Sequence, residues 1–192
     1  MPREQARALT TLLDLKEVAR AGWLEHGIPA LATESVADHS FGMALLATLL
    51  PLPVEVDRHR LAALCLLHDL AEAIVGDFTP HNAPADKHVQ EQTALAGQLA
   101  RLRAAEVLQK GADSLQAALI TDDRTDPTTA WVHYLDRFER LLQAYRYRCA
   151  GLGVDLAEFA HTPHGLEGTP LAAMADVLVA QLRASEHPQS WH

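Results

Sequence analysis

Apolar residues recur along most of this chain at intervals of three and four positions, the spacing that places side chains on one face of an α-helix. The segments with this spacing are residues 4–25, 36–50, 58–75, 86–110, 112–121, 127–150 and 169–185. No window shows sustained alternation of β-branched and polar residues, so we expect no β-strand of consequence. The pattern therefore predicts an all-α fold, a helical bundle that spans residues 1–192 as one domain.

Residues at the ends of these segments indicate where the helices begin and end. Ser35 followed by Asp38 is typical of a helix N-terminus, and Asp57 can cap the helix predicted over 58–75. Lys110–Gly111 provides a basic last turn and a glycine, as at a helix C-terminus. We expect one face of the helix over 36–50 to be apolar, and it carries Phe41, Ala44, Leu45 and Leu49.

The length of 192 residues is sufficient for one sizeable core and argues against two full domains. The net charge is −9, with 25 acidic and 16 basic residues. Binding to the backbone of nucleic acids needs a basic face, so we expect no nucleic-acid partner. A small phosphorylated substrate remains compatible with this charge, because a local cluster of Arg or Lys can oppose the global sign.

The sequence offers no membrane-spanning segment or zinc-type cysteine pair. The longest apolar run, Met43–Leu52, contains Thr48 and Pro51 and is too short to cross a bilayer. The N-terminal residues include acidic and polar side chains where a signal peptide would need an unbroken apolar region. Cys65 and Cys149 are far apart and form no CxxC motif. We therefore expect a cytoplasmic protein with two thiols.

The stretch Leu66–Pro80 (LLHDLAEAIVGDFTP) places four ionisable residues, His68, Asp69, Glu72 and Asp77, in an otherwise apolar run. In the helix predicted over 58–75, Glu72 lies one turn beyond both His68 and Asp69 on the same face. Such groups are costly to bury unless they are paired or coordinated. An imidazole beside a carboxylate suits Mn, Co, Fe, Zn or Mg, so the stretch predicts a divalent metal ion.

Two further ligands are needed, and His39 and Asp136 are the candidates. His39 falls in the first turn of its predicted helix, and Asp136 lies at the edge of an apolar stripe. Each has an ordinary alternative: a buried structural histidine for His39, and a surface pair with Arg137 or Arg140 for Asp136. The order His … His-Asp … Asp along the chain favours the metal site.

This order resembles the HD-domain metal-dependent phosphohydrolases. Three longer strings resemble the 5′-deoxynucleotidase branch of that family: Glu34–His39 (ESVADH), His68–Glu72 (HDLAE) and Gly76–Pro80 (GDFTP). Arg20–Trp23 (RAGW) is similar to the Arg/Trp element of the same branch. The resemblance covers residues from about 12 to 147, and the region from 150 to 192 is expected to hold a loop and a final helix.

The resemblance implies a helical fold of the HD type with one divalent metal ion. The implied ligands are His39, His68, Asp69 and Asp136. It also implies hydrolysis of a deoxynucleoside 5′-monophosphate to a deoxynucleoside and phosphate, and a homodimer. Glu72 is then placed to orient or deprotonate the attacking water. The position of Asp77 is tied in the family to catalysis and to holding the substrate.

Four more residues are expected to contact the substrate. Arg20 can clamp a phosphate by two parallel hydrogen bonds. In the branch that this chain resembles, the Trp corresponding to Trp23 is associated with a preference for deoxyribose, although a Trp at a helix end is often a core residue. Thr79 and Lys87 are further candidate phosphate contacts, and for Lys87 an ordinary surface position is the alternative.

Two other functions stay open from the sequence. One is an HD-fold hydrolase of another nucleotide or small phosphate ester, which the metal ligands would not distinguish. The other is an inactive ligand-binding module, which would require the loss of a ligand or of Glu72, and neither is lost here. Residues 120–127 depart from the acidic, aromatic stretch expected in the branch, so base preference is also open.

Overall fold

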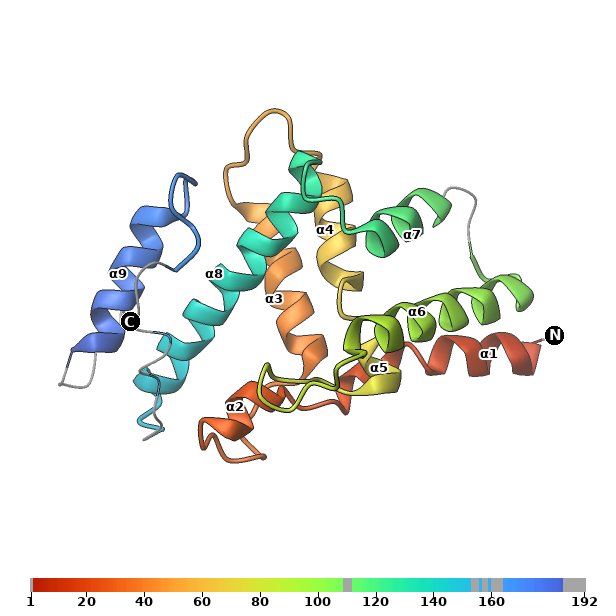
Figure 1. The fold of residues 1–192 in the computed structure, drawn as a ribbon, viewed down its shortest axis with the longest axis horizontal. Helices are drawn as coiled ribbons and strands as arrows, with labels where there is room; N and C mark the ends of the chain where they lie inside the picture. Colours follow the sequence, from red (N-terminus) through yellow and green to blue (C-terminus); the bar gives the residue numbers. More distant parts are fainter. Residues whose placement is uncertain (1, 109–111, 153–155, 157–158, 160–163, 185–192) are drawn as a thin grey trace.

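The computed structural model describes residues 2–108, 112–152, 156, 159 and 164–184, and helices dominate this part of the chain (Figure 1). They are α1 Pro2–Thr10, the 3₁₀ helix η1 Leu13–Lys16, α2 Ala21–Glu25, α3 Val36–Leu49, α4 Arg58–Leu67, α5 Glu72–Val75, α6 Lys87–Ala104, α7 Ala112–Thr121, α8 Pro127–Cys149 and α9 Ala172–Arg183. Within these described ranges, extended pairing is limited to one antiparallel bridge between Ala19 and Ser35. The all-α prediction is confirmed.

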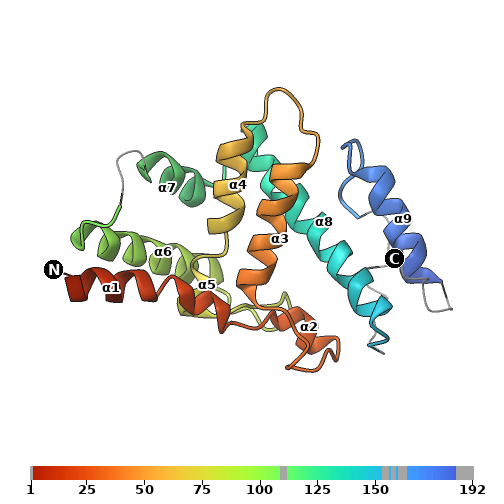
Figure 2. The same ribbon diagram turned by 180° about the vertical axis from the view of Figure 1, so that it is seen from behind.

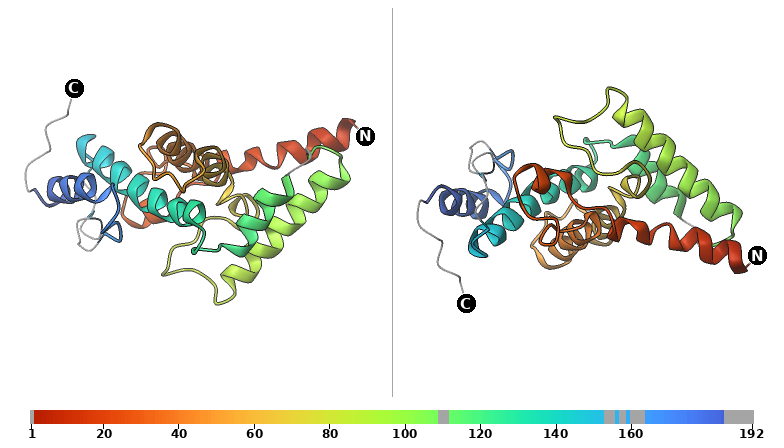
Figure 3. Two further views of the ribbon diagram at one scale, coloured as in Figure 1. Left: turned by 90° about the horizontal axis from the view of Figure 1, so that it is seen from above. Right: turned by 90° about the horizontal axis from the view of Figure 1, so that it is seen from below.

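Helices α3, α4 and α8 pack against one another at the centre of the molecule (Figures 1 and 2). Helix α9 covers the outer side of α8, whereas α1 and α6 lie side by side and extend away from the centre in the opposite direction (Figure 3). None of the described helices is long and apolar enough to cross a membrane.

Two clusters of buried apolar residues hold these helices together. The larger one joins α3, α4, α8 and α9 and includes Met43, Leu61 and Leu135, each fully excluded from solvent. The smaller one joins η1 and the α5 region to α6, with Leu15 and Leu95 among its members. Burial of apolar surface on this scale is the main favourable contribution to folding.

The predicted single helix over residues 4–25 is wrong. The chain leaves helical geometry after η1, and Arg20 has an extended backbone with φ −66° and ψ 108°. The Arg20 N–H donates to the Glu34 carbonyl at 3.0 Å, and the Val36 N–H donates to the Val18 carbonyl at 2.8 Å. These long-range hydrogen bonds satisfy the backbone groups that a continuous helix would have paired locally, and local periodicity cannot reveal them.

The predicted helix over residues 58–75 is interrupted at the residues that carry its chemistry. Asp57 caps α4 as expected, but α4 ends at Leu67. A tight turn follows, in which the Leu70 N–H donates to the Leu67 carbonyl and the Glu72 N–H to the Asp69 carbonyl, before α5 begins. Bonds that span three residues wind the backbone more tightly than an α-helix does. Glu72 therefore follows Asp69 through a turn and not along one α-helix.

The start of α3 is as predicted, and most of the apolar side chains expected on one of its faces are exposed. Ser35 and Asp38 form a reciprocal capping box. Phe41, Leu45 and Leu49 are exposed, at 64%, 45% and 71%. The residues of α3 that are buried are Val36, His39, Ser40, Met43, Ala44 and Ala47. This helix is apolar on nearly every side, so its contacts with α4 and α8 decide which side is buried.

Helix α6 is shorter than the predicted range of 86–110 and ends at Ala104. The chain turns through Glu106, which has the left-handed φ of 55° and donates its N–H to the Arg103 carbonyl. A residue in this conformation commonly terminates a helix, although glycine is the usual choice. The predicted end at residues 110–111 lies outside the described residues. Helix α9 is likewise shorter than the predicted range of 169–185.

Candidate metal centre and active site

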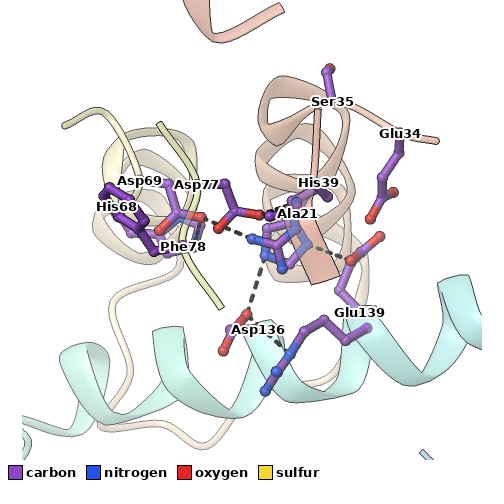
Figure 4. A network of polar contacts seen from close by, with 12 residues as sticks. Ala21, Glu34, Ser35, His39, His68, Asp69, Asp77, Phe78, Asp136 and Glu139 are labelled. Atoms are coloured by element: carbon purple, nitrogen blue, oxygen red, sulfur yellow. Dashed lines mark hydrogen bonds and ion pairs between the residues drawn. The ribbon is translucent and has the colours of Figure 1, made fainter. Parts of the chain in front are cut away.

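Three helical elements bring together His39, His68 and Asp136. His39 lies in the first turn of α3, His68 directly follows α4, and Asp136 lies in the middle of α8. One ligand atom from each falls within 4.8 Å of the other two. Figure 4 shows these side chains pointing toward one another. The packing of α3, α4 and α8 therefore assembles a cluster from residues up to about a hundred positions apart.

Asp69, the fourth predicted ligand, adjoins this cluster through His68. The Nδ1 of His68 is 2.9 Å from the Cys65 carbonyl oxygen, which can only accept, so Nδ1 carries the proton. The other nitrogen, Nε2, lies 3.0 Å from Asp69 Oδ2. The guanidinium of Arg20 approaches the same Asp69 oxygen at 3.6 Å. The imidazole of His68 is thus oriented with Nε2 toward the acidic side of the site.

The donor set fits a divalent cation. His39 Nε2 and Glu72 Oε2 are buried and lack a hydrogen-bond partner among the described residues. His39 Nε2 lies 3.2 Å from Asp136 Oδ1 without the geometry of a hydrogen bond. Buried polar atoms are seldom left without a partner. Imidazole nitrogens with carboxylate oxygens suit first-row divalent metals, and a cation among them would give His39 Nε2 a partner.

Two carboxyl groups of the site, those of Asp136 and Asp69, have lowered pKa values. Burial alone would raise the pKa of Asp136, but its close contact with His39 and the charge of Arg140 hold that pKa well below its usual range. Burial likewise opposes ionisation of Asp69, whose pKa His68 nonetheless lowers to about 2. For His39, burial lowers the pKa, but Asp136 and Glu139 outweigh it and raise the pKa to about 9. A protonated His39 thus balances charge that a metal ion would balance instead.

Glu72 responds to the same negative surroundings in the opposite way. Burial, followed by the charges of Asp69 and Asp77, raises the pKa of Glu72 to about 10. Its carboxyl group is therefore protonated at neutral pH when no cation is present. A positive charge nearby favours the ionised form of a carboxyl group, so metal binding would move this pKa downward.

Asp77 joins the loop after α5 to the start of α2. Its Oδ2 accepts a hydrogen bond from the Ala21 N–H at 2.7 Å. Ala21 directly follows Arg20, whose side chain is only 13% exposed and lies against Asp69. One oxygen of Asp77 thus has a structural partner next to the arginine of the site.

Trp23 is a core residue that also borders the cavity of the site. It is 2% exposed, its ring stacks on Phe159 with centroids 4.7 Å apart, and it meets Tyr147 edge to face. The indole N–H donates to Glu34 Oε1 at 2.8 Å. Burial, and then the charge of Glu139, raises the pKa of Glu34 to about 7. The predicted contact between Trp23 and a sugar stays a prediction.

Thr79 and Lys87 border the cavity with partners of their own. The buried hydroxyl of Thr79 donates to Glu25 Oε1 at 2.6 Å, so its proton is directed away from any phosphate. The Lys87 ammonium lies 3.3 Å from Glu91 and 3.4 Å from the Phe78 carbonyl oxygen. Their roles in substrate binding remain predictions.

The cavity above the cluster has a volume of about 720 Å³. Its wall includes Arg20, His68, Asp69, Glu72, Asp77 and Asp136. Ligand pockets of about 300–1,000 Å³ accommodate small organic molecules, so a mononucleotide is within range. The ionisable side chains that the sequence predicts to act on the metal ion or the substrate therefore border one cavity. His39 is the exception, because it is fully buried beneath the cavity.

Sequence reasoning missed several polar residues around this cavity. Glu139 contacts His39 with its carboxylate 2.5 Å from Nδ1. His133 and Asp122 form a 2.6 Å pair in the cavity wall. The spacing of three residues between Glu139 and Asp136 could have indicated a shared helix face. Nothing local could have indicated that Asp122, from the loop before α8, folds back onto His133.

The raised pKa of Glu34 predicts a pH-dependent stability of the metal-free protein. The folded-state pKa of about 7 lies above the ordinary value of 4.5, so folding favours the protonated form. This contribution to stability is complete below pH 4.5 and is lost as the pH rises through about 7. Glu34→Gln retains an acceptor for Trp23 but cannot ionise.

We therefore expect the stability of Glu34→Gln relative to the parent to increase from pH 5 to pH 8, because only the parent loses free energy of unfolding over this range. Urea denaturation at both pH values, on protein stripped of metal, measures the two differences. An equal difference at pH 5 and pH 8 would show that Glu34 titrates normally.

Comparison with known proteins places the chain among related enzymes. It is 32% identical over 154 residues to the 5′-deoxynucleotidase hdd1 of Schizosaccharomyces pombe, covering 79% of this chain and 76% of that protein. It is 34% identical over 148 residues to the human 5′-deoxynucleotidase HDDC2, covering 74% of this chain and 69% of the human protein.

Solved structures share its fold. The crystal structure of the PH0347 protein from Pyrococcus horikoshii matches with a TM-score of 0.70 and 26% identity, over 93% of this chain and 99% of the other. A predicted metal-dependent phosphohydrolase from Magnetospirillum magnetotacticum matches with a TM-score of 0.66 and 25% identity, over 94% of each chain. Residues 12–166, more than half of the chain, match the family described as HD domain. The chain therefore belongs to the HD-domain family, as its motifs and its fold both indicate.

Proposed function

We propose that this protein is a metal-dependent 5′-deoxynucleotidase, which removes the 5′-phosphate from deoxynucleoside 5′-monophosphates. The observation that carries the proposal is the cluster of His39, His68 and Asp136, whose ligand atoms lie within 4.8 Å of one another beneath a cavity of about 720 Å³. The similarity to proteins described as 5′-deoxynucleotidases supports the choice of substrate.

The proposed metal ligands are His39, His68, Asp69 and Asp136. A divalent cation held there would polarise a phosphoryl oxygen and make water more acidic. The identity of this cation, Mn, Co, Mg, Zn or Fe, is open. To bind the same ion, Asp69 would exchange the contact of its Oδ2 with His68 Nε2, now 3.0 Å away, for the metal ion.

Arg20 and Glu72 would act on the substrate. Arg20 is nearly buried beside Asp69 and borders the cavity, so its planar guanidinium can hold a phosphate with two parallel hydrogen bonds. Glu72 would orient the attacking water and accept its proton, since the carboxylate form is favoured once positive charge is near. Asp77, which holds Ala21, would keep Arg20 in place and contact the substrate with its second oxygen.

The other proposed contacts concern selectivity. The Trp23 indole is held by Phe159 and Glu34 at the border of the cavity, so it would form a rigid wall beside the sugar. Such a wall would disfavour a ribose with its extra 2′-hydroxyl. Thr79 and Lys87 would bind the phosphate only after breaking their contacts with Glu25 and Glu91, respectively.

Phosphate release from a panel of nucleotides tests this function. Metal-stripped protein would be assayed with 5′-dNMPs, 5′-NMPs and 3′-dNMPs, with Mn, Co, Mg or Zn added back. We expect release from 5′-dNMPs only when metal is present. Equal release from ribonucleotides would keep the reaction and remove Trp23 as a sugar filter. No release with any metal, from protein shown to bind one, would favour a hydrolase of another phosphate ester or an inactive binding module.

Two substitutions should separate metal binding from turnover. Glu72→Gln removes the proton acceptor but no proposed ligand, so we expect kcat to fall at least about 100-fold while metal affinity is retained. Asp69→Asn should instead weaken metal binding itself. Bound metal is measured by calorimetry, and turnover by phosphate release at saturating metal. A Glu72→Gln enzyme with unchanged kcat would exclude Glu72 as the base.

The family resemblance also leads us to propose a homodimer, with a second copy of this chain covering the apolar side chains Phe41, Leu45 and Leu49 of α3. These lie at intervals of four residues on one exposed helix face. Light scattering should give the mass of two chains for the parent and of one chain for Phe41→Glu. A monomeric parent would contradict the dimer, and a dimeric variant would contradict this face.

A further inference from the structure

The two ring nitrogens of His39 face different carboxylates. Nε2 faces Asp136 at the proposed metal centre, at 3.2 Å, whereas Nδ1 lies 2.5 Å from Glu139 Oε2 (Figure 4). The side chain of His39 is entirely buried, and Glu139 is 7% exposed. Glu139 and Asp136 are three residues apart on α8, so one face of this helix supplies both carboxylates.

This arrangement decides which nitrogen of His39 can bind a metal ion. A carboxylate oxygen can only accept, so the Nδ1 of His39 carries a proton and donates a hydrogen bond to Glu139. In the neutral ring, the lone pair is then on Nε2, the nitrogen that faces Asp136 and His68. Histidine ligands commonly use such a bond to a carboxylate to fix the tautomer and the orientation of the ring.

Gly42 provides the space that Glu139 occupies. A Cβ atom added at position 42 would lie 2.8 Å from Glu139 Oε1, closer than real contacts allow, and 3.1 Å from its Cγ, which is also tight. Glycine within a helix is less favourable than alanine by about 0.5–1 kcal/mol. Gly42 therefore weakens α3 locally, and the room it leaves is filled by the carboxylate that holds His39.

Glu139 is enclosed on its other side by Glu34. Ligand atoms of Glu34, His39 and Glu139 all lie within 4.8 Å of one another. Glu34 in turn accepts the indole N–H of Trp23, and its backbone N–H donates to the Tyr147 hydroxyl. The 2.5 Å approach between His39 Nδ1 and Glu139 leaves no room for a cation between those two atoms. The trio is therefore a hydrogen-bonded support for His39 and not a second metal site.

We propose that Glu139 is a positioning residue for the metal centre: seated in the space left by Gly42, it holds His39 so that Nε2 points at the metal ion. This inference rests on the proposed function, because it assumes that His39 is a ligand. Glu139 touches neither the substrate nor the metal ion, and its effect is exerted through the orientation and tautomer of His39.

Metal affinity of matched variants tests this role, with Mn²⁺ as the probe in calorimetric titrations of the full chain. Glu139→Leu removes the acceptor and should weaken Mn²⁺ binding by about 10- to 100-fold. Glu139→Gln retains an acceptor oxygen and should bind Mn²⁺ considerably more tightly than Glu139→Leu. Gly42→Ala leaves His39 and Glu139 themselves in place. It should also weaken Mn²⁺ binding, because the new methyl group would push the end of the Glu139 side chain away.

The control is Gln143→Leu, which replaces a buried polar residue one turn further along α8 that does not hold His39. It should bind Mn²⁺ like the parent, and circular dichroism checks that each variant is folded. If Glu139→Leu fails to fold, Gly42→Ala provides the comparison, since the substitution favours the helix. Parent-like affinity in both Glu139→Leu and Gly42→Ala would overturn the proposal, as would equal weakening in Gln143→Leu.

A second measurement separates this proposal from the proposed function. The ¹⁵N spectrum of the His39 ring in metal-free protein, followed to a pH at which the ring is neutral, reports the tautomer. We expect the proton on Nδ1 in the parent and a mixture of tautomers in Gly42→Ala. If the parent binds no Mn²⁺, the proposed function fails, whereas a parent ring protonated on Nε2 contradicts the role of Glu139 alone.

Discussion

An imidazole buried between two carboxylates is costly unless each of its nitrogens has a suitable partner, and this constraint governs the centre of the molecule. Glu139 satisfies Nδ1, whereas Nε2 faces Asp136 and is left open for the proposed metal ion; α8 supplies both carboxylates. At this contact α3 and α8 approach closely, with Gly42 facing the Glu139 side chain. The apolar residues around Leu135 and Met43 pack between the same helices.

The other functional side chains depend on irregular segments that this helix pair supports. The turn after α4 directs His68 and Asp69 toward α8. A hydrogen bond from His68 Nδ1 to the Cys65 carbonyl fixes the tautomer of the His68 ring. The bridge between Ala19 and Ser35 places Arg20 over Asp69, where Asp77 holds the following backbone N–H. His68, Asp69, Arg20 and Asp77 lie outside the helices, so local turns and long-range hydrogen bonds place their side chains.

The sequence was sufficient to predict the helical class and the residues that gather at the cavity, but not the way they are brought there. The motif around His68 predicted Glu72 one turn away along a continuous helix. Glu72 does line the same cavity, but a turn separates it from His68 and Asp69. Periodicity did not show which side of α3 is buried, because Phe41 and Met43 are both apolar and only Met43 is buried. Glu139 went unnoticed since a glutamate three residues from a ligand looks like any helix-surface charge until Gly42 is seen facing it.

The position of a bound metal ion tests the account most directly. Anomalous diffraction from a crystal of this protein grown with Mn²⁺ would locate the ion. The account predicts one strong peak within bonding distance of His39 Nε2, with His68, Asp69 and Asp136 as the other protein ligands and Glu139 still on His39 Nδ1. A peak bonded to His39 Nδ1, or one between Glu34 and Glu139, would contradict it.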